Sequence, residues 1–189
     1  MKNNVKKMVG IGVFSAIIVI LQLLGGGIKV GSLFSITLVL LPIVVGSAVY
    51  DWKAGAWLGF VFGLTVLLTG DAAAFMAISV PATIVVVLVK GILCGFAAGL
   101  IYKLVSKFQS TVAVISAAII CPVVNTGIFL LGCYLFFLPE ISKWAAAAGY
   151  DDAGSYIIFF LIGINFLVEL GTNIILSPVI VRLIRIGKK

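Results

Sequence analysis

Three polar side chains recur at helical spacing inside an apolar stretch near the C-terminus. Asn165, Glu169 and Asn173 are four residues apart, so on a helix they share one face. An amide, a carboxylate and an amide in an apolar helix must face protein groups or water rather than lipid. Such a stripe either joins helices by hydrogen bonds or lines a polar cavity. Asn173 is the deepest of the three and is expected to join helices.

A lysine lies inside another apolar stretch. Lys90 is about nine residues beyond Pro81, which corresponds to roughly 13 Å along a helix. A charge at that depth costs several kcal/mol unless it is paired or hydrated. We therefore expect Lys90 to contact a ligand, to pair with Glu169, or to do both. Asn125 lies at a depth comparable to that of Glu169 if the two helices are antiparallel.

These residues favour a polar cavity over simple hydrogen bonding between helices. One cation, one anion and several amides suit a small polar or zwitterionic solute, or a carboxylate that also carries hydroxyl and amide groups. An ion pore would need repeated rings of one ligand type. Two further polar residues, near the outer ends of the first and third apolar stretches, are expected at the mouth. The predicted substrate-binding residues are Lys90, Asn125, Asn165, Glu169, Asp71 and Gln22.

Several kinds of chemistry have no support in the sequence. There is no histidine, which removes the commonest general base and metal ligand. The nucleotide-binding phosphate loop, the zinc-protease motif and the nucleophile elbow are all absent. The cysteines Cys94, Cys121 and Cys133 lie in apolar stretches without metal-ligand spacing. We expect no enzyme, no metal and no cofactor, so active transport would need a partner or an ion gradient.

The composition predicts an all-α membrane protein with one domain over residues 1–189. The chain is 63% hydrophobic and 10% charged, whereas soluble domains are about 45–50% apolar and about 25% charged. A membrane-spanning helix needs about 20 apolar residues, so the chain has room for about six. The net charge of +7 comes from cations that flank apolar stretches, which indicates topology and contact with lipid rather than nucleic-acid binding.

Six membrane-spanning helices are predicted. The second and the fifth contain Pro42 and Pro122, Pro139 ends the fifth, and Pro178 lies near the end of the sixth. Pro81 suits the first turn of the fourth. The predicted ranges are 8–24, 35–50, 54–68, 81–104, 111–138 and 155–186.

The distribution of Lys and Arg predicts that both termini are cytoplasmic. With that orientation only Lys29 and Lys143 lie outside. The outer connections, residues 25–34, 69–80 and 139–154, are longer than the inner ones. Long outer connections either form a lid over a site or simply join helices. The cytoplasmic cations would be Lys2, Lys6, Lys7, Lys53, Lys103, Lys107, Arg182, Arg185, Lys188 and Lys189.

Small residues recur at four-residue spacing in three of the predicted helices. Gly12 and Ala16 in the first would let another helix approach closely, either a partner or a helix of this chain. Longer runs in the third and fourth helices predict tight internal packing. Those runs are Gly55, Gly59 and Gly63, and Gly91, Gly95 and Gly99.

Three segments are similar to one transporter family. They are residues 35–48 (SITLVLLPIVVGSA), residues 55–63 (GAWLGFVFG) and Lys90-Gly91 followed by residues 98–103 (AGLIYK). With six helices, about 190 residues and the small-residue motif in the first helix, the chain resembles the substrate-binding (S) components of energy-coupling factor (ECF) vitamin transporters.

This resemblance implies a function, partners and a site. An S component captures a vitamin from outside without hydrolysing anything, then docks on an ECF membrane scaffold driven by two cytoplasmic ATPases. It is thought to topple in the membrane. The family's AxxxA motif, which contacts the scaffold, reads Gly12 to Ala16 here, so glycine replaces the first alanine. Family binding sites lie in the outer half, where Lys90, Asn125, Asn165 and Glu169 fall.

Among vitamins, the chain looks most like the pantothenate-type members. A lysine suits the carboxylate of pantothenate, and amides suit its hydroxyl and amide groups. The aromatic content of the outer half is low for a stacked ring such as flavin or thiamin. Niacin, riboflavin, folate and a queuosine precursor stay open. Rival hypotheses are a solitary proton-coupled permease that uses Glu169, an intramembrane enzyme, and a structural subunit.

Overall fold

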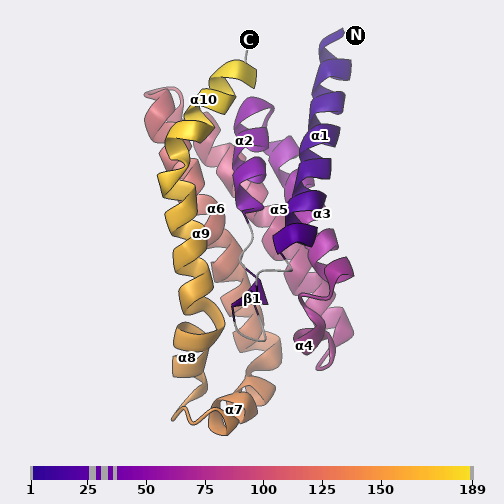
Figure 1. Cartoon of the computed structure of the whole chain (residues 1–189), viewed down its shortest axis with the longest axis vertical. Coiled ribbons are helices and arrows are strands. Elements are labelled where there is room, and N and C mark those ends of the chain that lie inside the picture. The colour runs from indigo at the N-terminus through magenta and orange to yellow at the C-terminus, as the bar shows by residue number, and fades with distance from the viewer. Residues whose placement is uncertain (1, 26–28, 31–33, 36–37, 188–189) are drawn as a thin grey trace.

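The computed structural model describes residues 2–25, 29–30, 34–35 and 38–187. They form a bundle of roughly parallel and antiparallel helices (Figure 1). The N-terminal helix begins and the C-terminal helix ends at the same end of the bundle (Figure 1). The long helices are α1 (Lys2–Gly25), α3 (Trp52–Thr69), α5 (Val80–Val105) and α6 (Ser110–Gly132).

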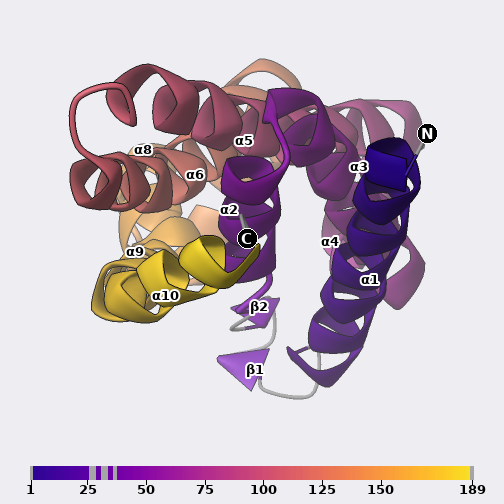
Figure 2. The same cartoon turned by 90° about the horizontal axis from the view of Figure 1, so that it is seen from above.

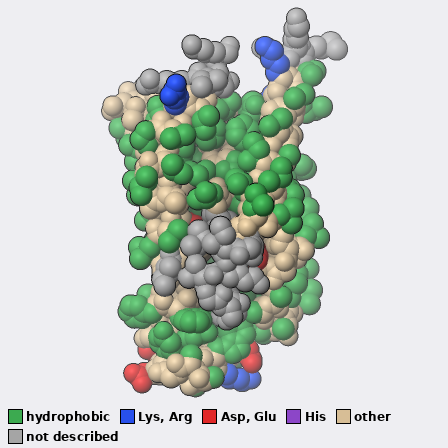
Figure 3. Space-filling view, viewed as in Figure 1, with side chains coloured by type: hydrophobic (Ala, Val, Ile, Leu, Met, Phe, Trp, Pro, Cys, Tyr) green, Lys and Arg blue, Asp and Glu red, His purple; other side chains and the backbone are tan. Residues whose placement is uncertain are grey.

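Four helical segments of the described chain are long and apolar enough to cross a membrane: Val5–Gly25, Trp52–Thr69, Val80–Val105 and Ser110–Ala147. A fifth crossing results if the bent pair Ala153–Ile162 and Asn165–Ile175 counts as one broken span. Apolar side chains are spread over the face shown in Figure 3. The blue Lys and Arg side chains lie at its two ends, and a little red is also visible at mid-height. This distribution supports a membrane protein, while six spans stay a prediction that would require α2 (Leu40–Val49) to cross.

Helix α2 is short because it is central. It contacts α1, α3, α5 and α6 as well as the C-terminal helices, and Figure 2 shows it between α1 on one side and α10 on the other. Most of its residues are buried. A helix enclosed by other helices can be apolar all round without facing lipid.

Glycines bring α3 and α5 into backbone contact. A Cβ atom added at Gly59 would overlap the carbonyl oxygen of Gly91, and one added at Gly55 would overlap that of Gly95. At the end of this seam, a Cβ at Gly99 would lie 2.6 Å from the Cα of Trp52. The predicted tight packing of these two glycine runs is therefore confirmed.

The predicted start of the second helix was wrong. Ser35 belongs to β2 (Phe34–Ser35), which pairs antiparallel with β1 (Lys29–Val30). The helix begins only at Leu40. A short apolar run does not distinguish helix from strand by its periodicity, which explains the error. Within the predicted connection 25–34, residues 26–28 and 31–33 lie outside the described residues.

The predicted end of the fifth helix was also wrong. Helix α6 continues through a π-helical turn, η1 (Cys133–Phe137), into α7 (Leu138–Ala147). Pro139 lies in the first turn of α7, directly after the π-helical turn, and does not end the helical run. The predicted outer connection 139–154 is therefore largely helical. It ends with a short turn, α8 (Ala153–Ser155).

The predicted sixth helix is divided into three segments. They are the π-helical η2 (Tyr156–Ile162), α9 (Gly163–Ile175) and α10 (Ser177–Gly187). The chain bends by 41° between the η2 segment and α9. Pro178 lies in the first turn of α10 and cannot donate to Ile174, so the helix is interrupted at Leu176. The start predicted at Pro81 is confirmed within one residue, since α5 begins at Val80.

The buried apolar side chains form two clusters. One is centred on Ile43, Leu58 and Ala117 between α2, α3 and α6. The other is centred on Phe137 and Ile141 near the outer connections, which also include the short α4 (Ala73–Met76). A cavity lies where the two clusters meet, since it is lined by members of both.

Candidate substrate-binding site

The cavity contains about 840 Å³ of empty space, its open mouth included. Helices α3, α5, α6 and α9 contribute most of its wall. The remainder comes from the two π-helical turns, the end of α1, and the connection after α3, which includes α4. All six residues predicted to bind substrate line this cavity: Gln22, Asp71, Lys90, Asn125, Asn165 and Glu169. The structure thus brings together residues from five separate segments, while their contact with substrate stays a prediction.

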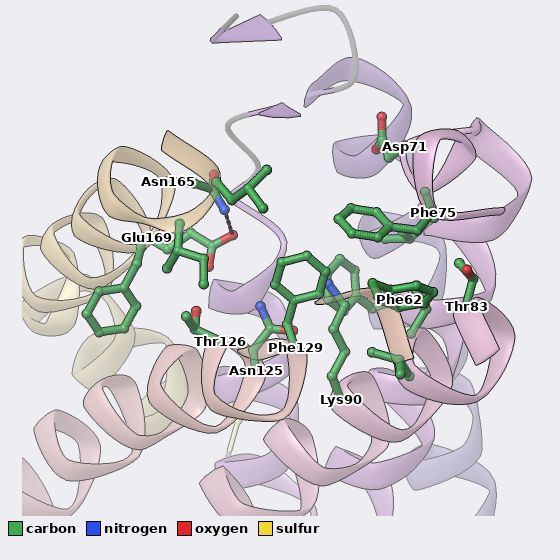
Figure 4. Close-up of a pocket in the computed structure, with 18 of the residues that line it drawn as sticks. Phe62, Asp71, Phe75, Thr83, Lys90, Asn125, Thr126, Phe129, Asn165 and Glu169 are labelled. Atoms are coloured by element: carbon green, nitrogen blue, oxygen red, sulfur yellow. Dashed lines mark hydrogen bonds between the residues drawn. The ribbon is translucent and has the colours of Figure 1, made fainter. Parts of the chain in front are cut away.

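Lys90 reaches into the cavity from α5 between aromatic rings (Figure 4). Its ammonium lies 5.2 Å from the ring centre of Phe129 and 5.9 Å from that of Phe62. These are cation–π distances. Among the described residues, the oppositely charged pairs within 4.0 Å are Lys7–Asp51 and Lys143–Glu140. The alternative that Lys90 pairs directly with Glu169 is therefore not realised.

Glu169 lies on the opposite wall with its neighbours on α9. Asn165 Nδ2 donates to Glu169 Oε1 at 3.3 Å (Figure 4). The second carboxylate oxygen, Oε2, is buried, and no described residue donates a hydrogen bond to it. Glu169 is 5% exposed, so bulk water does not compensate this oxygen freely. The wall formed by α9 therefore presents an acceptor in need of a donor.

Asn173 does not join helices as expected. Its Nδ2 donates to the backbone oxygen of Glu169 at 2.9 Å, which is a bond within α9. Asn173 is 2% exposed and is outside the cavity wall. The third member of the stripe consequently supports the helix that carries Glu169.

Three amides of the cavity wall also have buried oxygens without a partner. They are Gln22 Oε1, Asn125 Oδ1 and Asn165 Oδ1. An unsatisfied buried polar group costs about 1–3 kcal/mol. Such groups are rare in proteins, and their concentration around one cavity indicates donors that come from a bound solute or water.

The two mouth residues are bonded to each other. Gln22 Nε2 donates to Asp71 Oδ2, and Thr69 Oγ1 donates to the same oxygen at 3.3 Å. This contact connects the end of α1 to the connection after α3. Gln22 is 1% exposed, so its side chain is enclosed by protein at this side of the cavity.

The sequence analysis missed the aromatic lining. Phe62, Phe75, Phe129, Phe137 and Phe166 all line the cavity, so the expectation of few aromatic residues in this region was wrong. The ring centres of Phe75 and Phe129 are 5.3 Å apart, and those of Phe75 and Phe137 are 5.1 Å apart. One signal was available: Phe129 follows Asn125 by four residues and therefore shares its helical face.

The outer connections pack closely around the site. Trp144 of α7 contacts the ring of Phe75, with ring centres 5.8 Å apart. The strands β1 and β2 lie between α1 and α9 in Figures 1 and 2, and Figure 4 shows them beside Asn165. These segments are ordered elements next to the cavity, and the hypothesis that they act as a lid stays a prediction.

The small-residue motif of α1 faces outward. Gly12 and Ala16 are exposed, and a Cβ added at Gly12 would meet no atom within 4 Å. The alternative of internal packing at Gly12 is therefore not realised. Exposed apolar neighbours such as Val13 and Ile20 continue this surface along α1.

A family model described as "ECF transporter, substrate-specific component" matches residues 6–181. No curated protein and no solved structure matches.

Proposed function

The chain belongs to the family of ECF transporter substrate-specific components, and from this premise we propose that it captures a small water-soluble vitamin outside the cell. Members of this family are substrate-binding subunits of transporters and not enzymes. Membership also implies a small-molecule substrate and interaction with ECF scaffold and ATPase modules.

The observation that most supports this proposal is the set of polar groups around the cavity that lack a hydrogen-bond or ion-pair partner among the described residues. Among the described residues, no carboxylate lies within 4.0 Å of the Lys90 ammonium, and four buried oxygens of the cavity wall lack donors. A bound solute with complementary groups would satisfy both sets at once. Among vitamins, pantothenate offers a carboxylate for Lys90 and hydroxyl and amide protons for the oxygens.

The aromatic lining keeps other vitamins as candidates. Phenyl rings near Lys90 could stack on a flat heterocycle, so niacin, riboflavin, folate and a queuosine precursor are alternatives in one ligand screen. Pantothenate is preferred for two reasons. Several buried oxygens of the wall need donors, which pantothenate supplies. The ring of Phe75 already packs on Phe129, Phe137 and Trp144, which leaves less ring surface for a flat heterocycle.

We further propose six spans with both termini cytoplasmic in the cell membrane, with α2 as a short enclosed crossing. The outward-facing Gly12 and Ala16 would then contact the ECF scaffold from the cytoplasmic half of α1. Their exposure and lack of neighbours support this assignment, because a close helix contact needs small residues on an open face.

Ligand binding by the isolated chain tests this proposal. The chain is purified without partners, and a retained ligand is identified by mass spectrometry, with a panel of vitamins in a thermal-shift assay. We expect one vitamin to bind in a 1:1 complex, and vesicles that contain the chain alone to accumulate none of it. Accumulation driven by a proton gradient alone would contradict the proposal and support a solitary permease.

A further inference from the structure

Three charged residues line the cavity. Asp71 is bonded to Gln22 and Thr69 at one side, and Lys90 and Glu169 lie on different walls. Glu169 projects from α9 beside Asn165, whereas Lys90 projects from α5 among the phenyl rings (Figure 4). No carboxylate of the described residues lies within 4.0 Å of the Lys90 ammonium. The cavity therefore holds the Lys90 ammonium without an ion pair to either of its two carboxylates, Asp71 and Glu169.

The Lys90 wall needs an acceptor. Rings of Phe62 and Phe129 attract the ammonium through their faces, but they accept no ordinary hydrogen bond from it. An ammonium has three donors and no acceptor. An anionic group of the solute would complete this site better than a neutral one, because charge-assisted hydrogen bonds are roughly twice as strong as neutral ones.

The α9 wall needs donors. An ionised carboxylate can only accept hydrogen bonds, and Glu169 Oε2 has none. The amides of Asn125 and Asn165 can turn either end toward a solute, so they adapt to what Glu169 requires. Carboxylic or phosphate groups on this side would be repelled, since like charges at short range disfavour binding.

We propose that the ligand is bipolar: an acidic group is held by Lys90, and several O–H or N–H donors at the other end face Glu169, Asn125 and Asn165. This inference rests on the proposed function of the cavity as a capture site. It selects compact acids that carry hydroxyl or amide donors. It disfavours neutral molecules and aromatic acids without donors.

Matched ligand pairs test the Lys90 end. The full-length chain in lipid nanodiscs is titrated with pantothenate and with panthenol, in which an alcohol replaces the carboxylate. We expect pantothenate to bind about 100-fold more tightly, because a site built for a polar group rejects the analogue that lacks it. In Lys90→Gln the ratio should fall below about fivefold, and in Lys90→Arg, which keeps the cation, the preference for the acid should remain.

Lys103→Gln is the matched control. Lys103 is an exposed lysine on the same helix, outside the cavity, so its removal should leave both affinities unchanged. Monodisperse elution and an unchanged melting temperature identify variants that are folded. Equal binding of pantothenate and panthenol by the natural chain would overturn the inference, and so would an unchanged ratio in folded Lys90→Gln.

Glu169→Gln tests the opposite end. We expect about tenfold or greater loss of pantothenate affinity with the preference for acid over alcohol retained, since Lys90 is intact. Loss of the preference instead would overturn the assignment of the two ends. If pantothenate does not bind, the ligand retained by the purified chain decides: an acid with at least two donors supports the inference, and any other ligand overturns it.

The failure of this inference and that of the proposed function are distinguishable. ATP-dependent uptake of a neutral vitamin through the ECF module would refute the bipolar ligand and leave the proposed function intact. Binding of a bipolar acid without uptake through that module would refute the proposed function and leave the bipolar ligand intact.

Discussion

Asn125 shows the conflict between stability and binding at the level of a single residue. Its amide is 6% exposed and its Oδ1 has no partner, so it costs folding free energy that a well-packed apolar residue would not. Binding sites commonly carry such strain because the missing partner belongs to the ligand. The position was predictable from one polar residue in an apolar stretch. The lack of a partner for Oδ1 was not predictable, because it depends on which side chains of other helices pack next to Asn125.

Asn125→Leu should therefore separate the two properties. We expect the melting temperature of the ligand-free chain to stay equal or rise by a few degrees, because an unsatisfied buried amide is removed. Vitamin affinity should fall about tenfold or more. Thermal-shift and calorimetric titration measure the two effects.

Asn173→Leu is the control for that change, since Asn173 is buried on α9 but outside the cavity wall. Its affinity should fall less than that of Asn125→Leu, because Asn173 does not line the cavity and acts only through the helix that carries Glu169. Unchanged affinity in Asn125→Leu would show that this amide does not contact the solute.

At the scale of elements, glycine spacing was the most informative pattern in the sequence. It predicted the contact of α3 with α5, which the structure realises through backbone atoms at Gly55, Gly59, Gly91 and Gly95. Prolines were less informative, because Pro139 and Pro178 begin helices rather than end or kink them. The π-helical turns η1 and η2 had no signal in the sequence, since they depend on how the two outer ends pack together.

Gly59→Ala should destabilise the protein. The added Cβ would overlap the carbonyl oxygen of Gly91, so α3 and α5 must separate, at a cost of about 1–3 kcal/mol or more. Gly127→Ala is the matched control in α6, because a Cβ there would meet no atom within 4 Å. Denaturation in detergent measures both. Equal stability of the two variants would contradict the tight seam.

Asp51 fixes the turn between α2 and α3. Its Oδ1 accepts from the Ala54 backbone N–H at 2.7 Å, and its Oδ2 accepts from Lys7 at 2.5 Å. Burial acts to raise the pKa of Asp51, but Lys7 and the Ala54 N–H outweigh it and lower the pKa below its usual value. The stabilisation is thus complete above the ordinary aspartate pKa of about 4 and is lost as the pH falls through the lowered value.

Replacement of Asp51 should remove, at neutral pH, the same stabilisation that protonation of its carboxylate removes in acid. Asp51→Ala removes both contacts and should cost about 1 kcal/mol. Asp51→Asn keeps the cap and should cost less. Melting curves from about pH 2 to about pH 7, a range that spans the ordinary aspartate pKa of about 4 and values below it, measure the effect. The Ala variant should lose less stability in acid than the natural chain. An equal acid response of the two would contradict this role.

At the scale of the whole molecule, the few charges carry most of the predictive information. Apart from Lys90 and Glu169, the charged residues lie at or beyond the ends of the predicted spans, which favoured six crossings. The described helices include four or five of sufficient length. The difference is α2 and, where it is not counted as one crossing, the bent pair Ala153–Ile162 and Asn165–Ile175. The enclosure of α2 within the bundle cannot be inferred from its own sequence.

Cysteine labelling tests that topology. In a background without the natural cysteines, Lys29→Cys and Lys143→Cys should react with an impermeant maleimide in intact cells. Lys53→Cys and Lys107→Cys should react only after permeabilisation. Labelling of positions 29 and 53 from the same side would show that α2 does not cross the membrane.

ATP-dependent uptake is the most direct test of the central claim that this chain captures a solute and needs an ECF module to move it. Proteoliposomes that contain the chain, the scaffold and both ATPases should accumulate the bound vitamin with ATP and not without it. Ala16→Trp should bind the vitamin normally but abolish uptake, because its bulk blocks the docking face of α1. Uptake that persists when the scaffold and ATPases are omitted would contradict the account.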